Sequence, residues 1–480
     1  MLSPFIYLFE TYKKQYVYDI NTNSILCVNE KLWEELRQNQ ESNGKYAFSP
    51  EVANEMETLI SMGYLSSNRW ASIEHPATKI LPFQLNNALS SVVLQVTQSC
   101  NLNCSYCPFA QGNYYSRKHS QKQMSNETAR ATIDFLVSNS TNTNCLSVGF
   151  YGGEPLINFD TVKYVVEYIA KTYPHKRFTY FMTTNATLLD EEKINFLDKH
   201  GFSLTISLDG PKEIHDRNRQ SFSHESSFDK VMHAIKTINE HYPEFHKRIS
   251  FNCVIDPNAS FDCFHTFFTT CDEIDEYLCR FSNISKANLQ VDDLSISNDY
   301  TTKYNFEIFK SILARIGKVD IQSVSPIVVT YMTDLLQVMY DKRMPGKLGT
   351  FGHPGGPCIP GGRKVFVNVD GNMFPCEKVN ELSPEMKIGN INIGFDIEKC
   401  SNLLNIAKLT EKECKNCWAS RLCYLCCLFC EKDNTISREE RMKNCHQVKQ
   451  HLINYFKIYA CLIEHDYNKN SQWFNYYYHE

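Results

Sequence analysis

The first part of the chain alternates apolar and polar residues as short strands do. The alternation runs through residues 16–20, stops at the turn-forming run 21–24 and resumes through residues 25–28, which predicts a β-hairpin. Asn29 can cap a helix that follows, and a second helical pattern ends near Gly63. We therefore expect a small winged-helix-like domain over residues 1–73, followed by a linker over residues 74–89 that contains Pro76 and Pro82.

Between residues 90 and 317 the pattern changes to apolar strands that alternate with amphipathic helices. The strands are expected at residues 91–97, 146–151, 178–184, 203–208, 249–255 and 289–296. One of the helices starts at a Ser125 cap, and the next carries an apolar stripe from Val162 to Ile169. These repeats predict an α/β fold whose parallel strands form a partial TIM-like (β/α)6 barrel, with its ligands at the carboxyl ends of the strands.

The remainder of the chain is less regular. A helical segment near residues 303–343 is followed by a run rich in glycine and proline at 345–362, which predicts a loop. We expect a bridging segment over residues 318–357, a cysteine-rich domain over 358–450 and a C-terminal helix or tail over 451–480.

Charge and hydropathy exclude two classes of partner. The formal net charge is -5 and the sequence pI is about 6.3, so the chain has no broad basic surface with which to neutralise nucleic-acid phosphates. No run of eighteen apolar residues is present, and the lysines near the start follow the apolar stretch, which is the reverse of a secretory signal. We expect a cytoplasmic protein with no nucleic-acid and no membrane partner.

The twenty cysteines indicate metal ligation rather than disulfide bonds, and about half of them lie beyond residue 357. A chain of this length does not need disulfides to compensate for a small core, and a cytoplasmic compartment keeps thiols reduced. Directly after the first predicted barrel strand come Cys100, Cys104 and Cys107, with three and then two intervening residues. Three thiolates can hold a four-iron cluster and leave one iron free for a substrate, whereas a closed zinc site needs a fourth ligand. A zinc site or chance clustering is the alternative.

This CxxxCxxC motif, with the aromatic Tyr106 before its last cysteine, resembles the signature of the radical S-adenosylmethionine (SAM) superfamily. The resemblance implies that Cys100, Cys104 and Cys107 hold a catalytic 4Fe-4S cluster. The free iron would bind the methionine part of SAM, and one electron would cleave the cofactor to a 5'-deoxyadenosyl radical.

Further motifs at successive strand ends resemble the same superfamily. Gly152, Gly153, Glu154 and Pro155 resemble its GGEP motif, which receives the methionine amino group; Thr183, Thr184 and Asn185 resemble TTN; Ser207, Asp209, Gly210, His215, Asp216 and Arg219 resemble a pattern found in the subfamily with additional clusters. The resemblance implies that Ser207, Asp209 and Arg219 help to hold the ribose and the carboxylate. Any one of these motifs alone is more often an ordinary turn.

A second group of cysteines resembles the SPASM domain of radical SAM maturation enzymes. Its members, with Gly371 at the spacing that the domain has, are Cys358, Cys376, Cys414, Cys417, Cys423, Cys427 and Cys445. The resemblance implies an outer auxiliary 4Fe-4S cluster on Cys414, Cys417, Cys423 and Cys445 and an inner one on Cys358, Cys376 and Cys427, which makes three clusters in all. A zinc ribbon is the alternative.

The inner cluster is one ligand short, since residues 352–357 contain no cysteine. An open iron there could bind a substrate thiolate. Alternatively, Cys400, Cys426, Cys430 or a solvent molecule completes the site. The remaining cysteines have no ligand spacing, and we expect them to be buried free thiols: Cys27, Cys145, Cys253, Cys263, Cys271, Cys279 and Cys461.

The N-terminal pattern resembles the precursor-recognition element of enzymes that modify ribosomally made peptides. Such a domain can add the leader of a precursor peptide to its sheet edge, so residues 1–73 are expected to bind the leader. A winged helix that binds DNA or only packs on the barrel is the alternative.

Together the resemblances imply a radical SAM peptide maturase that forms a thioether between a cysteine and a carbon of its precursor. A flavodoxin or ferredoxin-type protein would donate electrons. The competing hypotheses are a carbon-carbon cross-link, an epimerisation, formylglycine formation as in sulfatase maturases and, outside enzymes, a zinc-stapled winged-helix binding protein. No catalytic base can be chosen without a substrate pose.

Overall fold

The N-terminal unit is a three-stranded sheet followed by two helices. The computed structural model describes residues 3–110, 116–223, 225–275, 277–284, 296–342, 346–355 and 358–467. Strands β1 (Ile6–Glu10), β2 (Gln15–Asp19) and β3 (Ser24–Val28) pair antiparallel in that order, and α1 (Glu30–Glu41) and α2 (Pro50–Ser61) follow. This confirms the predicted hairpin and both helices, whereas β1 was not predicted.

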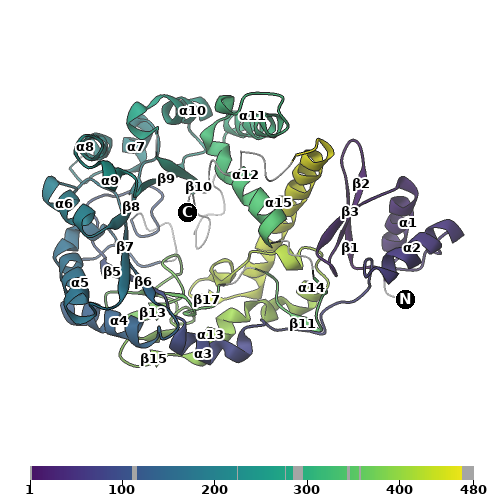
Figure 1. Ribbon diagram of the computed structural model, residues 1–480, viewed down its shortest axis with the longest axis horizontal. Helices are drawn as coiled ribbons and strands as arrows, with labels where there is room; N and C mark the ends of the chain where they lie inside the picture. Colours follow the sequence, from purple (N-terminus) through teal and green to yellow (C-terminus); the bar gives the residue numbers. More distant parts are fainter. Residues whose placement is uncertain are drawn as a thin grey trace.

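The two faces of this sheet pack on different partners. Ile6 and Val17 lie in one small core with α1 and α2. Phe9 and Tyr18 point the other way and pack on Phe456 of the C-terminal helix, at ring centroid distances of 5.4 and 4.8 Å. The N-terminal unit is therefore attached to the rest of the protein through that helix, which crosses between it and the barrel (Figure 1).

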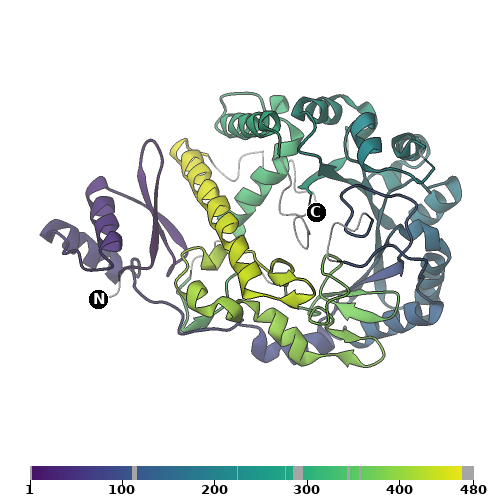
Figure 2. The same cartoon turned by 180° about the vertical axis from the view of Figure 1, so that it is seen from behind.

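Six parallel strands form the barrel sheet, and each pairs with the next in the chain. They are β5 (Ser91–Thr97), β6 (Cys145–Gly152), β7 (Arg177–Thr184), β8 (Phe202–Ser207), β9 (Ile249–Ile255) and β10 (Leu278–Asn283). The connecting helices are α4 (Asn126–Ser138), α5 (Phe159–Thr172), α6 (Glu191–Lys199), α7 (Lys212–Asn218), α8 (Ser227–His241), α9 (Pro243–His246) and α10 (Phe261–Thr270). The helices line the outer side of the curved sheet, as Figures 1 and 2 show from opposite sides. Five strands lie where the sequence predicts them.

A strand that was not predicted pairs with β9. Leu278–Asn283 pairs with β9, whereas the sequence pattern indicated residues 289–296, of which 289–295 lie outside the described residues. Both runs alternate apolar and polar residues, and the pattern alone cannot say which of two neighbouring runs reaches the edge of β9.

The barrel sheet continues into the cysteine-rich part of the chain. β12 (Lys364–Val367) pairs parallel with β5, and β13 (Asn372–Phe374), β14 (Gly389–Asn390) and β15 (Gly394–Phe395) extend the sheet antiparallel. Phe366 and Phe374 are buried in the same core as the barrel strands. The predicted cysteine-rich domain therefore begins as an extension of the barrel sheet.

Several connecting segments are more regular than expected. The expected linker contains the helix α3 (Leu81–Asn87). Pro82 does not prevent this helix, because it lies in the first turn, where a proline is tolerated. β4 (Ser72–Ile73) pairs with β11 (Phe351–Gly352) inside the run rich in glycine and proline. The expected helical segment is divided into α11 (Asn298–Arg315) and α12 (Val329–Leu336), with a π-helical turn at Gln337–Lys342.

The last part of the chain contains α13 (Ile397–Leu404), α14 (Glu411–Lys415), the hairpin β16 (Glu431–Lys432) and β17 (Thr435–Ile436), and α15 (Arg438–Glu464). The C-terminal helix thus begins before residue 451, since the Ser437 side chain caps it. Within the described ranges, no helix is long and apolar enough to cross a membrane.

Candidate iron-sulfur and cofactor site

The three cysteines of the CxxxCxxC motif lie on one loop that leaves the carboxyl end of β5. Burial raises the pKa of the Cys100 thiol to about 12, and the charges of Cys104 and Cys107 raise it further, which places the three thiols near one another. Burial also raises the pKa of Cys104 to about 11. Coordination to iron would remove these protons.

Two glycines let this loop pass directly over the end of β6. A Cβ on Gly152 would lie 2.3 Å from the Thr97 carbonyl oxygen, and a Cβ on Gly153 would lie 2.1 Å from the Ser99 carbonyl oxygen and 2.9 Å from the Cys100 nitrogen. These neighbours are backbone atoms that cannot move aside cheaply. The glycines therefore determine where the cysteine loop begins.

Glu154 joins the ends of β6 and β7. Its carboxylate accepts hydrogen bonds from the backbone N–H of Leu156 (3.1 Å), the Thr184 hydroxyl (2.6 Å) and the backbone N–H of Asn185 (2.7 Å). Burial raises the pKa of Glu154 to about 7, although these hydrogen bonds oppose the shift. The Asn185 side chain in turn donates to Asn101 of the cysteine loop at 2.9 Å.

A buried ion pair on the opposite side holds the cysteine loop by its aromatic residue. The Tyr106 hydroxyl donates to Asp209 Oδ2, which also accepts from Arg219 Nε at 2.8 Å. Asp209 Oδ1 accepts from the backbone N–H of Val254 at 3.1 Å, so this pair also reaches β9. Arg219 lies 5.5 Å from the Tyr106 ring centroid and lowers the pKa of Cys104, against the larger effect of burial.

The loop fits a cluster with three protein ligands. Its thiols are buried or partly buried, they lie near one another, and motif residues from β6, β7 and β8 hold the loop from the sides. Ser207, at the end of β8, is buried at the same edge of the sheet. In the described part of the chain, no three His, Cys, Asp or Glu side chains converge tightly enough for a single metal ion.

Four of the SPASM-like cysteines line one pocket. Cys414, Cys417, Cys423 and Cys445 come together there from α14, the turn after it and α15. These are the four predicted outer-cluster ligands. Burial raises the pKa of Cys423 to about 12.

Arg441, which the sequence analysis did not identify, is fully buried in the same pocket. Its Nε donates to the Thr410 hydroxyl at 3.1 Å, and its Nη1 donates to the Leu425 carbonyl at 3.3 Å and the Cys430 sulfur at 3.4 Å. An arginine in a helix rich in charged residues carries no sequence signal of such burial.

Two of the three predicted inner ligands, Cys376 and Cys427, lie near each other. The charges of Cys376 and Cys430 raise the pKa of Cys427, which also shares a hydrogen bond with Cys426. Cys358 is exposed. The structure thus places Cys426 and Cys430 near the Cys376–Cys427 pair. Cys400 is buried elsewhere, with its thiol directed at the Ile388 carbonyl at 3.9 Å.

The prediction that seven further cysteines are buried is wrong for most of them. Cys253 is buried and shares a hydrogen bond with Cys279, but Cys279 itself is only partly buried. The exposed members are Cys27, Cys145 and Cys263, and the half-buried ones are Cys271, Cys279 and Cys461. Apolar flanking residues misled the prediction, because a cysteine on an amphipathic element can point to either face.

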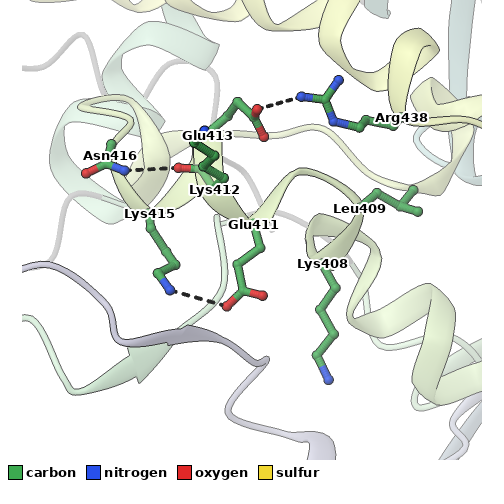
Figure 3. Close-up of a pocket in the computed structure, with 8 residues that line it drawn as sticks. All are labelled: Lys408, Leu409, Glu411, Lys412, Glu413, Lys415, Asn416 and Arg438. Carbon is green, nitrogen blue, oxygen red and sulfur yellow. Dashed lines mark hydrogen bonds and ion pairs between the residues drawn. The ribbon is translucent and has the colours of Figure 1, made fainter.

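Figure 3 shows a second, shallow hollow on the surface of α14. Its charged side chains are partly paired with one another, as in the Lys415–Glu411 contact at 3.6 Å and the Arg438–Glu413 ion pair. No predicted site residue lies among those that line it.

Comparisons with known proteins agree with this site. Residues 94–271 match the radical SAM superfamily. The chain is 27% identical over 349 residues to a "Cysteine-type anaerobic sulfatase-maturating enzyme" of Clostridium novyi (strain NT), covering 70% of this chain and 87% of the relative. It is 23% identical over 399 residues to "Radical SAM cyclopropyl synthase TigE" of Paramaledivibacter caminithermalis, covering 80% of this chain and 78% of the relative.

A solved structure has the same fold. It is described as "Native anSMEcpe with bound AdoMet", with a TM-score of 0.57 and 22% identity, and the match covers 79% of this chain and 99% of that one. The α/β barrel is thus of the radical SAM type. The match and the relatives indicate that the protein is an enzyme, and the superfamily that residues 94–271 match uses SAM and a 4Fe-4S cluster.

Proposed function

We propose that this enzyme modifies a ribosomally made peptide. The observation that carries the proposal is the cysteine loop, since one buried and two partly buried thiols lie together at the carboxyl end of β5. In the proposal, Cys100, Cys104 and Cys107 hold the cluster. When bound, the cluster and SAM supply the one-electron chemistry that removes a hydrogen atom from an unreactive carbon. The proposed cofactor-binding residues are Tyr106, Gly152, Gly153, Glu154, Pro155, Asn185, Ser207, Asp209 and Arg219.

In this proposal the motif residues position the cluster and the cofactor. Glu154 and Asp209 are occupied by hydrogen bonds from neighbouring loops, so we assign them mainly the task of fixing the loop that carries the cysteines. Gly153 leaves its backbone open to close approach at the end of β6.

We further propose two auxiliary clusters. The pocket with Cys414, Cys417, Cys423 and Cys445 supports the outer one. For the inner one we keep Cys358, Cys376 and Cys427 as predicted ligands. The neighbouring Cys426 and Cys430 offer a fourth thiol, which competes with a substrate cysteine for the open position.

Residues 1–73 are proposed to bind the leader of the precursor. β3 pairs with β2 along one side only, among the described residues, so its other edge can accept an added strand. Cys27 is exposed on this strand. A peptide precursor made without its leader should therefore bind more weakly, and Cys27→Arg should weaken binding of the full precursor but not of the leaderless one.

For the product we propose a thioether. One hydrogen atom leaves the attacked carbon, and the cysteine thiol loses its proton as the carbon-sulfur bond forms. The one electron released would be taken up by an auxiliary cluster when that cluster is bound. The second candidate is oxidation of a cysteine or serine side chain, which the sulfatase-maturating relatives favour.

Mass spectrometry of the precursor after anaerobic co-expression tests the proposal. A loss of two hydrogens together with a thiol that no longer reacts with iodoacetamide indicates the thioether. For a cysteine, exchange of sulfur for oxygen together with loss of two hydrogens indicates the second candidate. A loss of two hydrogens with the thiol still reactive indicates an oxidised serine where a hydrazide labels the new aldehyde, and a carbon-carbon cross-link where it does not. If reconstituted enzyme with flavodoxin or ferredoxin cleaves SAM but leaves every peptide unchanged, peptide modification is wrong.

A further inference from the structure

A buried ion pair connects the cysteine loop to the cysteine-rich part of the chain. Arg117 lies on the segment between the CxxxCxxC motif and α4, and Glu381 follows Cys376 after β13. Arg117 Nε donates to Glu381 Oε1 at 2.7 Å, and the two side chains are 6% and 5% exposed. The pair bridges residues that are 264 positions apart in the sequence.

The ion pair leaves several of its own polar atoms without partners. Nη1 and Nη2 of Arg117 and Oε2 of Glu381 are buried with no hydrogen-bond partner among the described residues. Glu381 Oε1 is already used, because Gln95 Nε2 also donates to it at 2.6 Å. The Phe109 ring covers one face of the guanidinium at 3.9 Å. Buried donors and acceptors are almost always paired in folded proteins, so these atoms indicate a missing ligand.

The pair lies between the two groups of cysteines. Arg117 lowers the pKa of Cys107 of the proposed catalytic cluster, against the larger effect of burial. Burial is the main cause of the raised pKa of Tyr151, at the end of β6. The charges of Glu377, Cys107 and Glu381 also raise this pKa, and the charge of Arg117 lowers it. Glu377 directly follows Cys376. If the proposed catalytic cluster lies at the motif loop, the pair lies close to the place where a substrate would react.

The unpartnered atoms match an amide. The two guanidinium nitrogens are donors, and Glu381 Oε2 is an acceptor, which is the complement of one C=O and one N–H. Because Arg117 and Glu381 already neutralise each other, a charged ligand would leave a buried net charge, whereas an amide would not. We infer that Arg117 and Glu381 bind one peptide group of the substrate backbone beside the residue that is modified. This inference rests on the proposed function.

The first experiment uses two conservative enzyme variants with cofactor and clusters bound. Glu381→Gln replaces one acceptor oxygen of the carboxylate with an NH2 donor. Arg117→Lys removes the two planar guanidinium donors. We expect the KM for the precursor to rise about tenfold, as for one or two lost hydrogen bonds, with the Kd for SAM and the iron content unchanged. Asp198→Asn, which breaks a more exposed ion pair with Arg248 away from the site, is the control and should change neither.

The second experiment changes the substrate and leaves the enzyme native, so it does not depend on the variants folding. A precursor in which an ester replaces the amide N–H next to the modified residue should bind wild-type enzyme about tenfold more weakly. Glu381→Gln should discriminate less between ester and amide, because its acceptor is altered. The amide could instead come from an asparagine or glutamine side chain of the precursor. In that case, replacing that side chain would weaken binding of the precursor, whereas the ester would not.

Three outcomes would overturn the inference. If the Kd for SAM rises and the KM for the precursor does not, the pair belongs to the cofactor site. If neither constant changes and wild-type enzyme tolerates the ester, the pair is only structural. In both cases wild-type enzyme still modifies the precursor, whereas failure of the proposed function would show as SAM cleavage by wild-type enzyme with no modified peptide at all. The third outcome is that the ester-containing precursor binds normally, whereas replacing an asparagine or glutamine of the precursor abolishes binding. That result would show that the pair does not bind the peptide backbone.

Discussion

Replacing Arg441 with glutamine should lower the reduction potential of the proposed outer auxiliary cluster. Arg441 is fully buried, and no ion pair with a carboxylate is recorded for it among the described residues. Its hydrogen bonds go to a hydroxyl, a carbonyl and the sulfur of Cys430. Its positive charge therefore has no described carboxylate partner, and adding an electron to a cluster there would be more costly without it.

The size of the effect depends on the distance from the guanidinium to the sulfur of Cys414, a proposed ligand. The Thr410 hydroxyl lies between them, 3.1 Å from Arg441 Nε and 3.2 Å from the Cys414 sulfur. The guanidinium is thus within about 6 Å of a proposed ligand sulfur. At an effective dielectric constant of about 20, a unit charge at about 6 Å contributes roughly 3 kcal/mol. For a one-electron couple, 59 mV corresponds to about 1.4 kcal/mol, so we expect the potential to fall by about 120 mV.

An anaerobic redox titration followed by electron paramagnetic resonance measures this shift. The titration is best made in a background with Cys100, Cys104 and Cys107 replaced by alanine, so that only auxiliary clusters contribute signals. Arg441→Lys keeps the charge and should restore most of the potential. If Arg441→Gln retains its iron and both variants stay within about 30 mV of the parent enzyme, the charge argument is wrong.

Three further predictions concern the folded scaffold. Gly153→Ala would bring a Cβ within 2.1 Å of a backbone oxygen in the cysteine loop, so the enzyme should lose about one cluster's iron, whereas Gly346→Ala, whose nearest neighbour would lie at 3.9 Å, should keep its iron. Burial lowers the pKa of His353 to about 4 from its usual 6.5, so the contribution of this histidine is present above pH 6.5 and is lost as the pH falls toward 4. Denaturant titrations should therefore show wild-type enzyme losing about 2 kcal/mol more than His353→Gln between pH 7.5 and pH 5; an equal loss in both would contradict this. Asp209→Asn leaves Arg219 buried without its negative partner, so the free energy of unfolding should fall by about 3 kcal/mol or more, and a change below about 1 kcal/mol would refute the role of this pair.

The sequence by itself determined the local elements and the order of the motifs. Five barrel strands, the Asn29 and Ser125 helix caps and the placement of each motif after a strand were predictable, because alternation, capping and turn chemistry act within a few residues. The resemblance to the SPASM domain grouped the four outer cysteines, and these four line one pocket in the structure.

Only the tertiary structure decided what depends on distant parts of the chain. β10 pairs with the edge of β9 and β12 pairs with the edge of β5, because long-range hydrogen bonding selects among segments with similar patterns. Arg117 meets Glu381, and Arg441 is buried among cysteines, although nothing in their local sequence distinguishes them from surface charges. Whether a charged side chain is buried and paired depends on how the chain packs. The local sequence pattern does not predict which distant group will lie within hydrogen-bond distance of that side chain.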